Sequence, residues 1–544
     1  DANSGLVGAD LFATKYAVAA DSPQIKILRG ESYFLRAYYY MQLECLYGEK
    51  YINLTQPASS DANVLGVPIY TTIPTDLAGT SAPRSTARQV WTLIIKDLDS
   101  ARSLLPASWP ATNMGRATSW TAKGLLGKVF VYTQEWDSAK AVLLDVITNG
   151  TGPRGLPLQL MPFNIYKQAF NSNAFPGSLN NNTDQKFNQE SIFELEIDRV
   201  PGNGGYGIFG NSPNLYLTSS MGLFLQPSGF KNDGVGWQGM GYGDGYISNE
   251  NLNRFGFNVS PDSLDASSLV ANQSFVANST STLGYVSTTK VPGTYYQHVS
   301  DSFRTTGAAD PRLYVCALEP YMDTVVFSES GSPSDRYKRP VSKTVNISPG
   351  DGFLAWSLKK YQTLDAGIQL ELTQSDGANL YFLRLADIYL LYAEACMNTS
   401  DNVDALEYIN KVHRRAYNQP INTPSAVDYI SLTDLTKAGA SDVNLGHNPL
   451  AYERHAELFA EGNWWFDIGR WGNSTNSTPS GPNNFNSNFG LNEANFYGNS
   501  LTPLPVQPSR WTNIQSYSYP IPSTEINANT ALASQPNGGQ NPGY

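Results

Sequence analysis

Residues 229–247 read GFKNDGVGWQGMGYGDGYI, a run that holds seven glycines, one Trp and two Tyr. A run of this composition can serve one of two binding functions. A glycine-rich loop can cradle a phosphate with its backbone N–H groups. Glycine also lets the backbone bend so that aromatic rings are turned toward a ligand.

The phosphate interpretation depends on the G-x-G-x-x-G dinucleotide fingerprint, which must lie between a strand and a helix. Two runs have this spacing: Gly202, Gly204 and Gly207, and Gly234, Gly236 and Gly239. The residues that follow them read IFGNSP and MGYGDG, in which Gly and Pro break any helix. We therefore expect no nucleotide and no other cofactor.

Three glutamates, Glu453, Glu457 and Glu461, are spaced four apart in the single helix that the sequence predicts over residues 447–468. Two carboxylates roughly 5–9.5 Å apart can hydrolyse a glycosidic bond. A row of acids on one helix face is more often solvated or ion-paired, and Arg454 and Arg470 are nearby in the sequence. We therefore assign no catalytic role to these three glutamates.

Metal-ligand spacing is also absent from the sequence. None of the histidines belongs to an H-E-x-x-H motif, and the three cysteines are too widely spaced to imply a disulfide framework. The histidines are His298, His413, His447 and His455. We predict no metal site.

The composition restricts the classes of partner. The net charge of the 544 residues is −11, and a nucleic-acid partner would need a basic face, so we exclude one. No run of about 18 apolar residues is present, so no segment is expected to span a membrane. Charged residues make up 15% of the chain, and Asn, Ser, Thr and Gly must supply the rest of the polar surface. Such a surface suits a secreted or cell-surface protein.

Helical periodicity dominates the first part of the chain. Residues 29–47 contain no Gly or Pro after residue 30 and predict a helix that ends at Gly48. Residues 84–105 predict a second helix, whose start can be capped by Ser85 or Thr86.

Two further segments have the pattern of a tetratricopeptide hairpin. In the first, Gly127 and Ala139 are the small residues that let two helices approach closely. In the second, Ala393 and Ala405 have the same separation, because 139 − 127 = 405 − 393 = 12. A single hairpin cannot bury its own apolar face, so such units must stack on one another.

The fold class is therefore mostly α: a tetratricopeptide-like scaffold in residues 1–150 and 376–472. Residues 151–375 form a large loop-rich insertion with short strands such as 191–197, and residues 473–544 form a loop-rich C-terminal segment. Insertions on repeat scaffolds gather on one face and often bind the ligand. We assign ligand binding to residues 151–375.

Six blocks of the sequence, in the same order, resemble the SusD/RagB family of outer-membrane nutrient-binding lipoproteins of the Bacteroidetes. They are RGESYFLRAYYYMQLECLYGEKYI, LGVPIYTTIP, RSTARQVWTLIIKDLDSA, LRLADIYLLYAEACMN, ERHAELFAEGNWWFDIGRWG and the ending YPIPSTEINAN…QNPGY. The resemblance covers nearly the whole chain. Because the fifth block is shared, its Trp464, Trp465 and Trp471 are expected to be packing residues.

The resemblance implies a single SusD-like domain without enzymatic activity. Such proteins lie on the cell surface as the lid of a SusC-type TonB-dependent transporter and pass oligosaccharides, or in some branches peptides, into it. Family members carry a lipidated Cys upstream of the first block. This sequence begins DANSGLVGAD, so an anchor in the outer leaflet of the outer membrane is inferred from the resemblance alone.

The resemblance also gives the glycine-rich run a role in binding a glycan. A sugar ring can lie flat on an aromatic face while polar side chains bond its hydroxyls. The predicted glycan-binding residues are Trp237 as the main platform, with Tyr242, Tyr246, Asn232 and Asp233, and Tyr295 and Tyr296 as a second aromatic pair.

Three alternatives remain open on the sequence. A RagB-like peptide binder would use backbone-pairing edges and charge in place of a flat aromatic platform. A secreted glycosidase would need two carboxylates facing one cleft. A tetratricopeptide scaffold for protein tails would bind in its helical groove.

Overall fold

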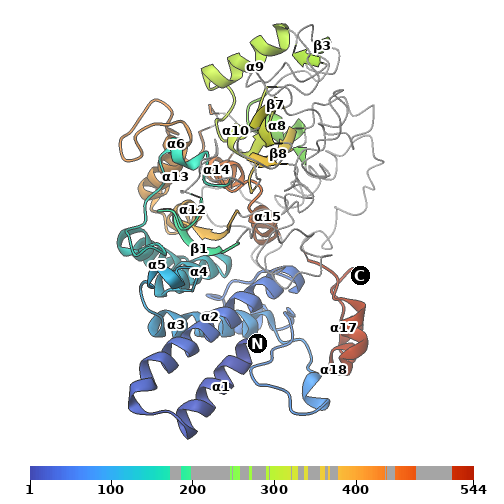
Figure 1. The fold of residues 1–544 in the computed structure, drawn as a ribbon. Coiled ribbons are helices and arrows are strands. Elements are labelled where there is room, and N and C mark those ends of the chain that lie inside the picture. Colours follow the sequence, from blue (N-terminus) through green and yellow to red (C-terminus); the bar gives the residue numbers. More distant parts are fainter. Residues whose placement is uncertain are drawn as a thin grey trace.

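The computed structural model describes most of the two ends of the chain and parts of its middle (Figure 1). The described residues are 1–171, 185–197, 246–247, 249–257, 269–271, 290–292, 294–319, 322–328, 336–340, 356–361, 365–367, 378–434, 436–437, 448–472 and 518–544.

The N-terminal part is a layer of antiparallel helices, α1 (Ala2–Lys15), α2 (Ser22–Tyr47) and α3 (Ala87–Leu104). Helix α2 thus begins at Ser22, before the predicted start at residue 29, and ends at Tyr47 as predicted. The predicted cap of α3 is confirmed, because the Thr86 hydroxyl accepts a hydrogen bond from Gln89 N at 3.3 Å while the Gln89 side chain accepts one from Thr86 N at 2.9 Å.

The two tetratricopeptide-like hairpins are confirmed. The first is α4 (Ser119–Tyr132) with α5 (Trp136–Asn149), and the second is α12 (Leu385–Asn398) with α13 (Asn402–Ala416). A methyl group on Gly127 would lie 2.7 Å from Leu143 Cγ, so this close helix contact excludes a side chain.

The predicted single helix at 447–468 is wrong. The segment forms two helices, α14 (Pro449–Glu457) and α15 (Trp464–Gly472). Ala460 has φ +61° and Gly462 has φ +78° between them. A left-handed backbone cannot continue a right-handed helix, so the chain turns at this point.

The described part of residues 151–375 contains mostly short elements. Its described helices are α6 (Phe163–Tyr166), α8 (Asn249–Arg254), α9 (Thr294–Thr306) and α10 (Leu313–Cys316). Its described strands are β1 (Ser191–Leu195), β2 (Tyr246–Ile247), β3 (Leu269–Ala271), β4 (Lys290–Pro292), β5 (Ala317–Leu318), β6 (Thr324–Ser328), β7 (Arg336–Pro340), β8 (Trp356–Leu358) and β9 (Asp365–Gly367). A further strand, β10 (Leu380–Arg384), follows them and directly precedes α12.

These strands form small sheets. β1 pairs antiparallel with β10, so the start of the middle region is joined directly to the strand that precedes α12. The other described sheets have the orders β2-β8-β5, β3-β4 and β7-β6-β9, in which only β6 and β9 are parallel.

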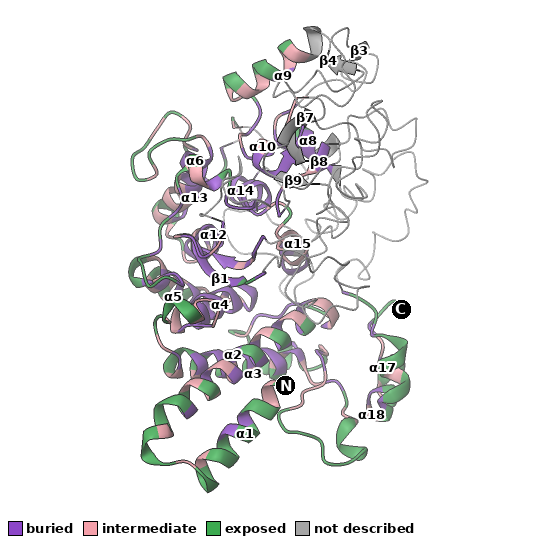
Figure 2. Cartoon of the chain, in the orientation of Figure 1, coloured by how far each residue is buried: buried purple, intermediate pink, exposed green. Residues whose placement is uncertain are grey.

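Helix α12 lies at the centre of the scaffold and is buried on every side (Figure 2). The largest apolar core joins it to α2–α5, α13 and the β1–β10 pair. Two of its buried residues are acids, and each has a cationic partner: Asp387 lies 2.9 Å from Lys128 Nζ, and Glu394 pairs with Arg470. Burial of these charges is tolerated because they are paired.

The C-terminal segment 518–544 runs beside the N-terminal helices (Figure 1). The buried Asn541 amide donates hydrogen bonds to Tyr47 O at 3.0 Å and Tyr519 O at 2.8 Å. This part was predicted to be loop-like but contains the short helices α17 (Ser523–Ala528) and α18 (Thr530–Ala533). Residues 473–517 lie outside the described part. None of the described helices combines the length and the apolar character needed to cross a bilayer.

Candidate ligand-binding site

Four of the predicted glycan-binding residues, Asn232, Asp233, Trp237 and Tyr242, lie outside the described residues. Tyr246 is the first residue of β2, where its backbone pairs with Ser357 of β8. Its side chain is not described. The roles of these residues stay predictions.

The second predicted pair, Tyr295 and Tyr296, lies in the first turn of α9, and these two side chains are also not described. α9 and β2 share one apolar core. In this core the ring centroids of Phe303, on α9, and Phe257 lie 4.7 Å apart, and Ile247, on β2, is buried. The structure thus places β2, which contains Tyr246, and α9, which contains Tyr295 and Tyr296, at the same core.

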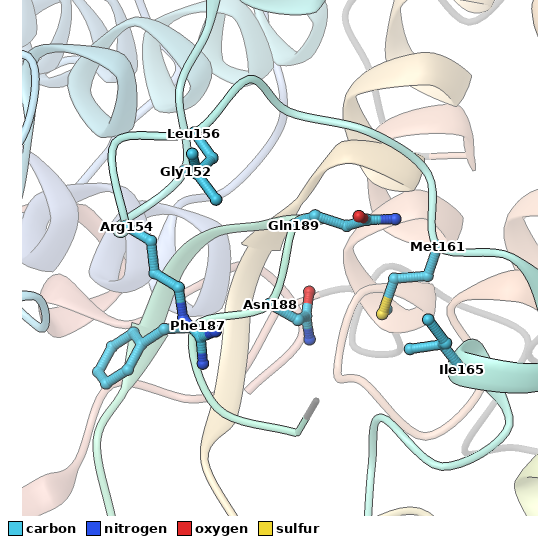
Figure 3. Close-up of a pocket in the computed structure, with 8 residues that line it drawn as sticks. All are labelled: Gly152, Arg154, Leu156, Met161, Ile165, Phe187, Asn188 and Gln189. Carbon is cyan, nitrogen blue, oxygen red and sulfur yellow. The ribbon is translucent and has the colours of Figure 1, made fainter. Parts of the chain in front are cut away.

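A pocket lies at the junction of the scaffold and the middle region (Figure 3). It has a volume of about 150 Å³. The described residues that line it are Gly152, Arg154, Leu156, Met161, Ile165, Phe187, Asn188 and Gln189. They come from two chain segments, residues 152–165, which run from the loop after α5 into α6, and residues 187–189, which precede β1.

One wall is a tight turn with the sequence TGPRGLP, in which Thr151 and Pro157 form an isolated β-bridge. Gly155 has φ +71°, which glycine adopts at little cost, and its N–H donates to Gly152 O at 2.8 Å. The turn presents Arg154, whose guanidinium extends toward Phe187 and Asn188 (Figure 3). Its Nη2 donates to Lys186 O at 3.0 Å, which joins the two walls.

The opposite wall is held by the Asn188 side chain, whose oxygen accepts from Glu190 N at 2.9 Å and whose amide donates to the Tyr381 hydroxyl at 2.8 Å. Phe187 has φ +51°, a conformation that costs a non-glycine residue roughly 1–2 kcal/mol. The buried Glu194 carboxylate accepts a hydrogen bond from the N–H of Phe187. Burial raises the pKa of Glu194 to about 7.

The loop between α3 and α4, which contains the aromatic residue Trp109, borders this pocket. Trp109 donates from its indole to Ala117 O at 2.8 Å, and the Arg116 guanidinium lies 3.8 Å above its ring. Arg116 is fixed by two hydrogen bonds of 2.6 Å to Glu31. A methyl group on Gly115 would lie 3.8 Å from the Phe187 ring, so this loop borders the pocket wall.

The three glutamates of the fifth block are buried, not solvated. Glu453 and Glu457 are fully buried, and the Glu461 side chain is 1% exposed. Burial opposes the ionisation of Glu453, but Arg312 and His413 hold its pKa at about 2. The prediction of an ion-paired face is confirmed, but the nearby Arg454 and Arg470 were the wrong partners for these three acids.

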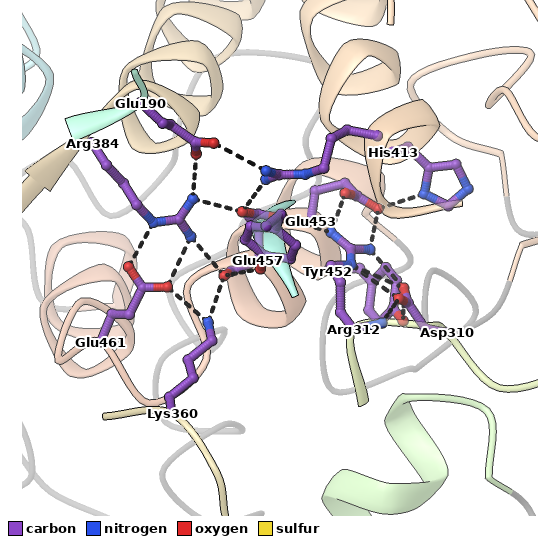
Figure 4. Close-up of polar contacts among 12 residues, drawn as sticks. Glu190, Asp310, Arg312, Lys360, Arg384, His413, Tyr452, Glu453, Glu457 and Glu461 are labelled. Carbon is purple, nitrogen blue, oxygen red and sulfur yellow. Dashed lines mark hydrogen bonds and ion pairs between the residues drawn. The ribbon is translucent and has the colours of Figure 1, made fainter. Parts of the chain in front are cut away.

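The true partners come from distant parts of the chain (Figure 4). Among the described residues, five carboxylates and four cations form one buried network. They are Glu190, Asp310, Glu453, Glu457 and Glu461, with Arg312, Lys360, Arg384 and Arg415. Because these glutamates are sealed inside the protein, they cannot serve as the substrate-facing acid pair of a glycosidase.

The tryptophans of the same block pack as predicted. Trp471 is 3% exposed, Trp464 lies against it at 5.8 Å in an edge-to-face contact, and Trp465 stacks on Tyr519. The buried His455 ring contacts Asn251 at 3.2 Å, and burial lowers its pKa well below the usual value.

One group among the described residues has metal-like geometry, because ligand atoms of Cys396, Asp401 and Asp404 lie within 4.8 Å of one another. Lys140 pairs with Asp401, and the Tyr392 hydroxyl donates to Asp404 at 2.9 Å. A cation is thus already supplied by the protein at this position.

Comparison with known families gives the identity of the fold. The profile described as "SusD family" matches residues 189–544, which is more than half of the chain. The chain belongs to the SusD family. A second profile, described as "Starch-binding associating with outer membrane", matches residues 13–131. A search of curated proteins finds no match.

Solved structures with the SusD fold are similar over the whole chain. A SusD-like protein from Bacteroides fragilis is 19% identical with a TM-score of 0.60, over 100% of this chain and 84% of that one. A SusD superfamily protein from Bacteroides vulgatus gives 19% identity and a TM-score of 0.55, over 97% and 81% of the two chains. A laminarin-binding SusD-like protein is 20% identical with a TM-score of 0.54, over 100% of this chain and 83% of that one.

Sequence reasoning missed Arg154, Phe187 and Trp109 in this SusD-family chain. The run TGPRGLP has the Gly and Pro density of a turn and could have indicated an exposed arginine at its apex. Nothing local predicts that residues 187–189 lie across from it, because their separation in sequence exceeds thirty residues.

Proposed function

We propose that this SusD-family protein captures oligosaccharides at the cell surface and passes them to a SusC-type TonB-dependent transporter, over which it acts as a lid. The observation that carries the proposal is the match of residues 13–131 to a profile described as starch-binding and outer-membrane-associated. The similar fold of a protein named as laminarin-binding supports the same ligand class.

Capture is assigned to the predicted residues of the insertion. Trp237 provides the main stacking face, with Tyr242, Tyr246 and the pair Tyr295 and Tyr296 as further platforms. Asn232 and Asp233 supply hydrogen bonds to sugar hydroxyls. Stacking and hydrogen bonding need no covalent chemistry and no cofactor.

An exposed apolar stripe on α2 supports a protein partner. Leu28, Leu35, Tyr39 and Leu43 are 44%, 40%, 58% and 42% exposed. Their separations of seven, four and four place them along one side of the helix. A contiguous apolar patch on a protein surface marks an interaction site, and we assign this one to the transporter. Anchoring of the chain by an upstream lipid in the outer leaflet belongs to the same proposal.

The test is calorimetric titration of the protein with neutral and acidic oligosaccharides and with a peptide mixture, for the wild type and Trp237→Ala. We expect one glycan class to bind and Trp237→Ala to weaken it at least about tenfold, as for a central aromatic contact. Tyr39→Ala removes an exposed aromatic ring from the scaffold and should leave glycan affinity unchanged.

Three results would change the proposal. Binding that survives Trp237→Ala moves the site away from the glycine-rich run and keeps the function. Binding of peptides without glycans favours the RagB-like alternative. Failure of the wild-type protein to associate with its transporter, or equal association by Tyr39→Ala, contradicts the assignment of the α2 stripe.

A further inference from the structure

None of the residues that line the pocket of Figure 3 belongs to the predicted aromatic platform, and the chemistry of the pocket is specific. At about 150 Å³ it is smaller than the roughly 300–1,000 Å³ of pockets that enclose drug-sized ligands. It can therefore hold a single sugar residue or the end of a chain.

The pocket combines apolar walls with one charge. Leu156, Met161, Ile165 and Phe187 supply the apolar surface, and Arg154 is the one ionisable residue among the eight that line it. Such a combination suits a ring with an apolar C–H face and a carboxylate substituent. The whole chain has a net charge of −11, so an acidic ligand needs a local cation of this kind.

The guanidinium of Arg154 has donors to spare. Among the described residues it donates one hydrogen bond, from Nη2 to Lys186 O. An arginine has five N–H donors in a planar fork that matches a carboxylate with two parallel bonds. The Gln189 amide extends across the pocket toward Met161 and can bond a ring hydroxyl (Figure 3).

Both walls are held in place before any ligand binds. The turn that presents Arg154 is closed by the β-bridge between Thr151 and Pro157, and the facing segment is pinned by the Asn188 hydrogen bonds. Rigid walls reduce the entropy lost on binding, so a small pocket can still contribute to affinity.

We propose that this pocket is a subsite for one acidic sugar residue, a uronate, whose carboxylate pairs with Arg154. The inference rests on the proposed glycan-binding function and adds a ligand class to it. It gives the protein a preference for acidic polysaccharides over neutral ones of the same length.

The experiment compares galacturonate and glucuronate oligosaccharides with neutral oligosaccharides of equal length, titrated into the intact protein. The variants are Arg154→Gln and, as a matched control, Arg102→Gln, an exposed arginine on α3 that pairs with Asp99. We expect Arg154→Gln to weaken uronate binding about tenfold, with neutral binding unchanged and the control without effect. Raising the salt concentration should weaken uronate binding to the wild type.

The outcomes separate the two proposals. Equal affinity for acidic and neutral ligands, or uronate binding that Arg154→Gln does not change, overturns the acidic subsite and leaves glycan capture standing. If no glycan binds at all, both proposals fail. Because Arg154 is exposed, an unchanged melting temperature of the variant confirms that it is folded.

Discussion

The carboxyl group of Glu44, a residue of α2, is buried in the protein. It is 4% exposed, and its Oε2 accepts a hydrogen bond from Val67 N at 3.1 Å. Gly66 packs so closely that a methyl group on it would lie 2.5 Å from the same oxygen. Burial raises the pKa of Glu44 to about 8, and the hydrogen bond from Val67 and the charge of Arg84 offset only part of this.

The raised pKa predicts how stability depends on pH. An unfolded glutamate has a pKa of about 4.3, so between pH 5 and 8 the folded state retains a proton that the unfolded state has lost. Glu44 therefore lowers the free energy of unfolding as the pH rises, by at most about 1.4 kcal/mol per pH unit. In Glu44→Gln this loss disappears, so the variant should gain stability relative to the wild type from pH 5 to 8.

Urea unfolding at several pH values measures the effect. Glu196→Gln, which removes an exposed carboxylate, is the control and should follow the wild type. A constant difference between Glu44→Gln and the wild type over this range would contradict the assignment of a proton to Glu44.

At the scale of elements, the α4–α5 hairpin depends on the absence of a side chain at residue 127. Replacing Gly by Ala in a helix normally stabilises by about 1 kcal/mol. At Gly127 the added methyl would overlap the Leu143 side chain, which is fully buried. We therefore expect Gly127→Ala to destabilise the protein by roughly 1–3 kcal/mol, as for overpacking of a core.

Gly8 of α1 offers a matched control, because nothing lies within 4 Å of a methyl group placed there. Gly8→Ala should stabilise by up to about 1 kcal/mol. Both values are read from denaturant midpoints. If Gly127→Ala were as stable as Gly8→Ala, the close contact of α4 and α5 would not be real.

The helices were predictable because their apolar residues repeat with a helical period and their ends carry local signals. Thr86 and the pair Gly127 and Ala139 are examples in which residue type alone fixes the geometry. The break between α14 and α15 was missed because Ala460, a strong helix former, adopts a left-handed backbone there. Tertiary contacts outweigh the local preference at that residue.

The candidate site shows the same limit more strongly. The aromatic run around Trp237 can be recognised from composition, but a pocket needs two walls. Arg154 and Gln189 lie on separate segments, which are joined by the hydrogen bonds from Gln159 N to Gln189 O and from Arg154 to Lys186 O, and no local pattern reports that contact. The division of the chain at residues 150 and 375 also stays a prediction.

At the scale of the whole molecule, the buried network of Figure 4 joins segments that are far apart in sequence. Arg384, at the end of β10, contacts Glu190, Glu457 and Glu461 at 2.7 Å each. It thereby ties the segment before β1 to α14 and to the turn after it. The position of the pocket wall at 187–189 depends on this attachment, since Glu190 follows it directly.

Removal of the Arg384 charge should therefore loosen more than one element. Arg384→Met leaves three buried carboxylates without this partner, and breaking a buried pair costs about 3–5 kcal/mol. Arg384→Lys keeps the charge but loses the fork, so its denaturant midpoint should lie between those of the wild type and Arg384→Met. Arg102→Met, which breaks an exposed pair with Asp99, should change stability by less than about 1 kcal/mol. If Arg384→Met were no worse than Arg102→Met, the network would be replaceable packing, and the attachment of the pocket wall would need another cause.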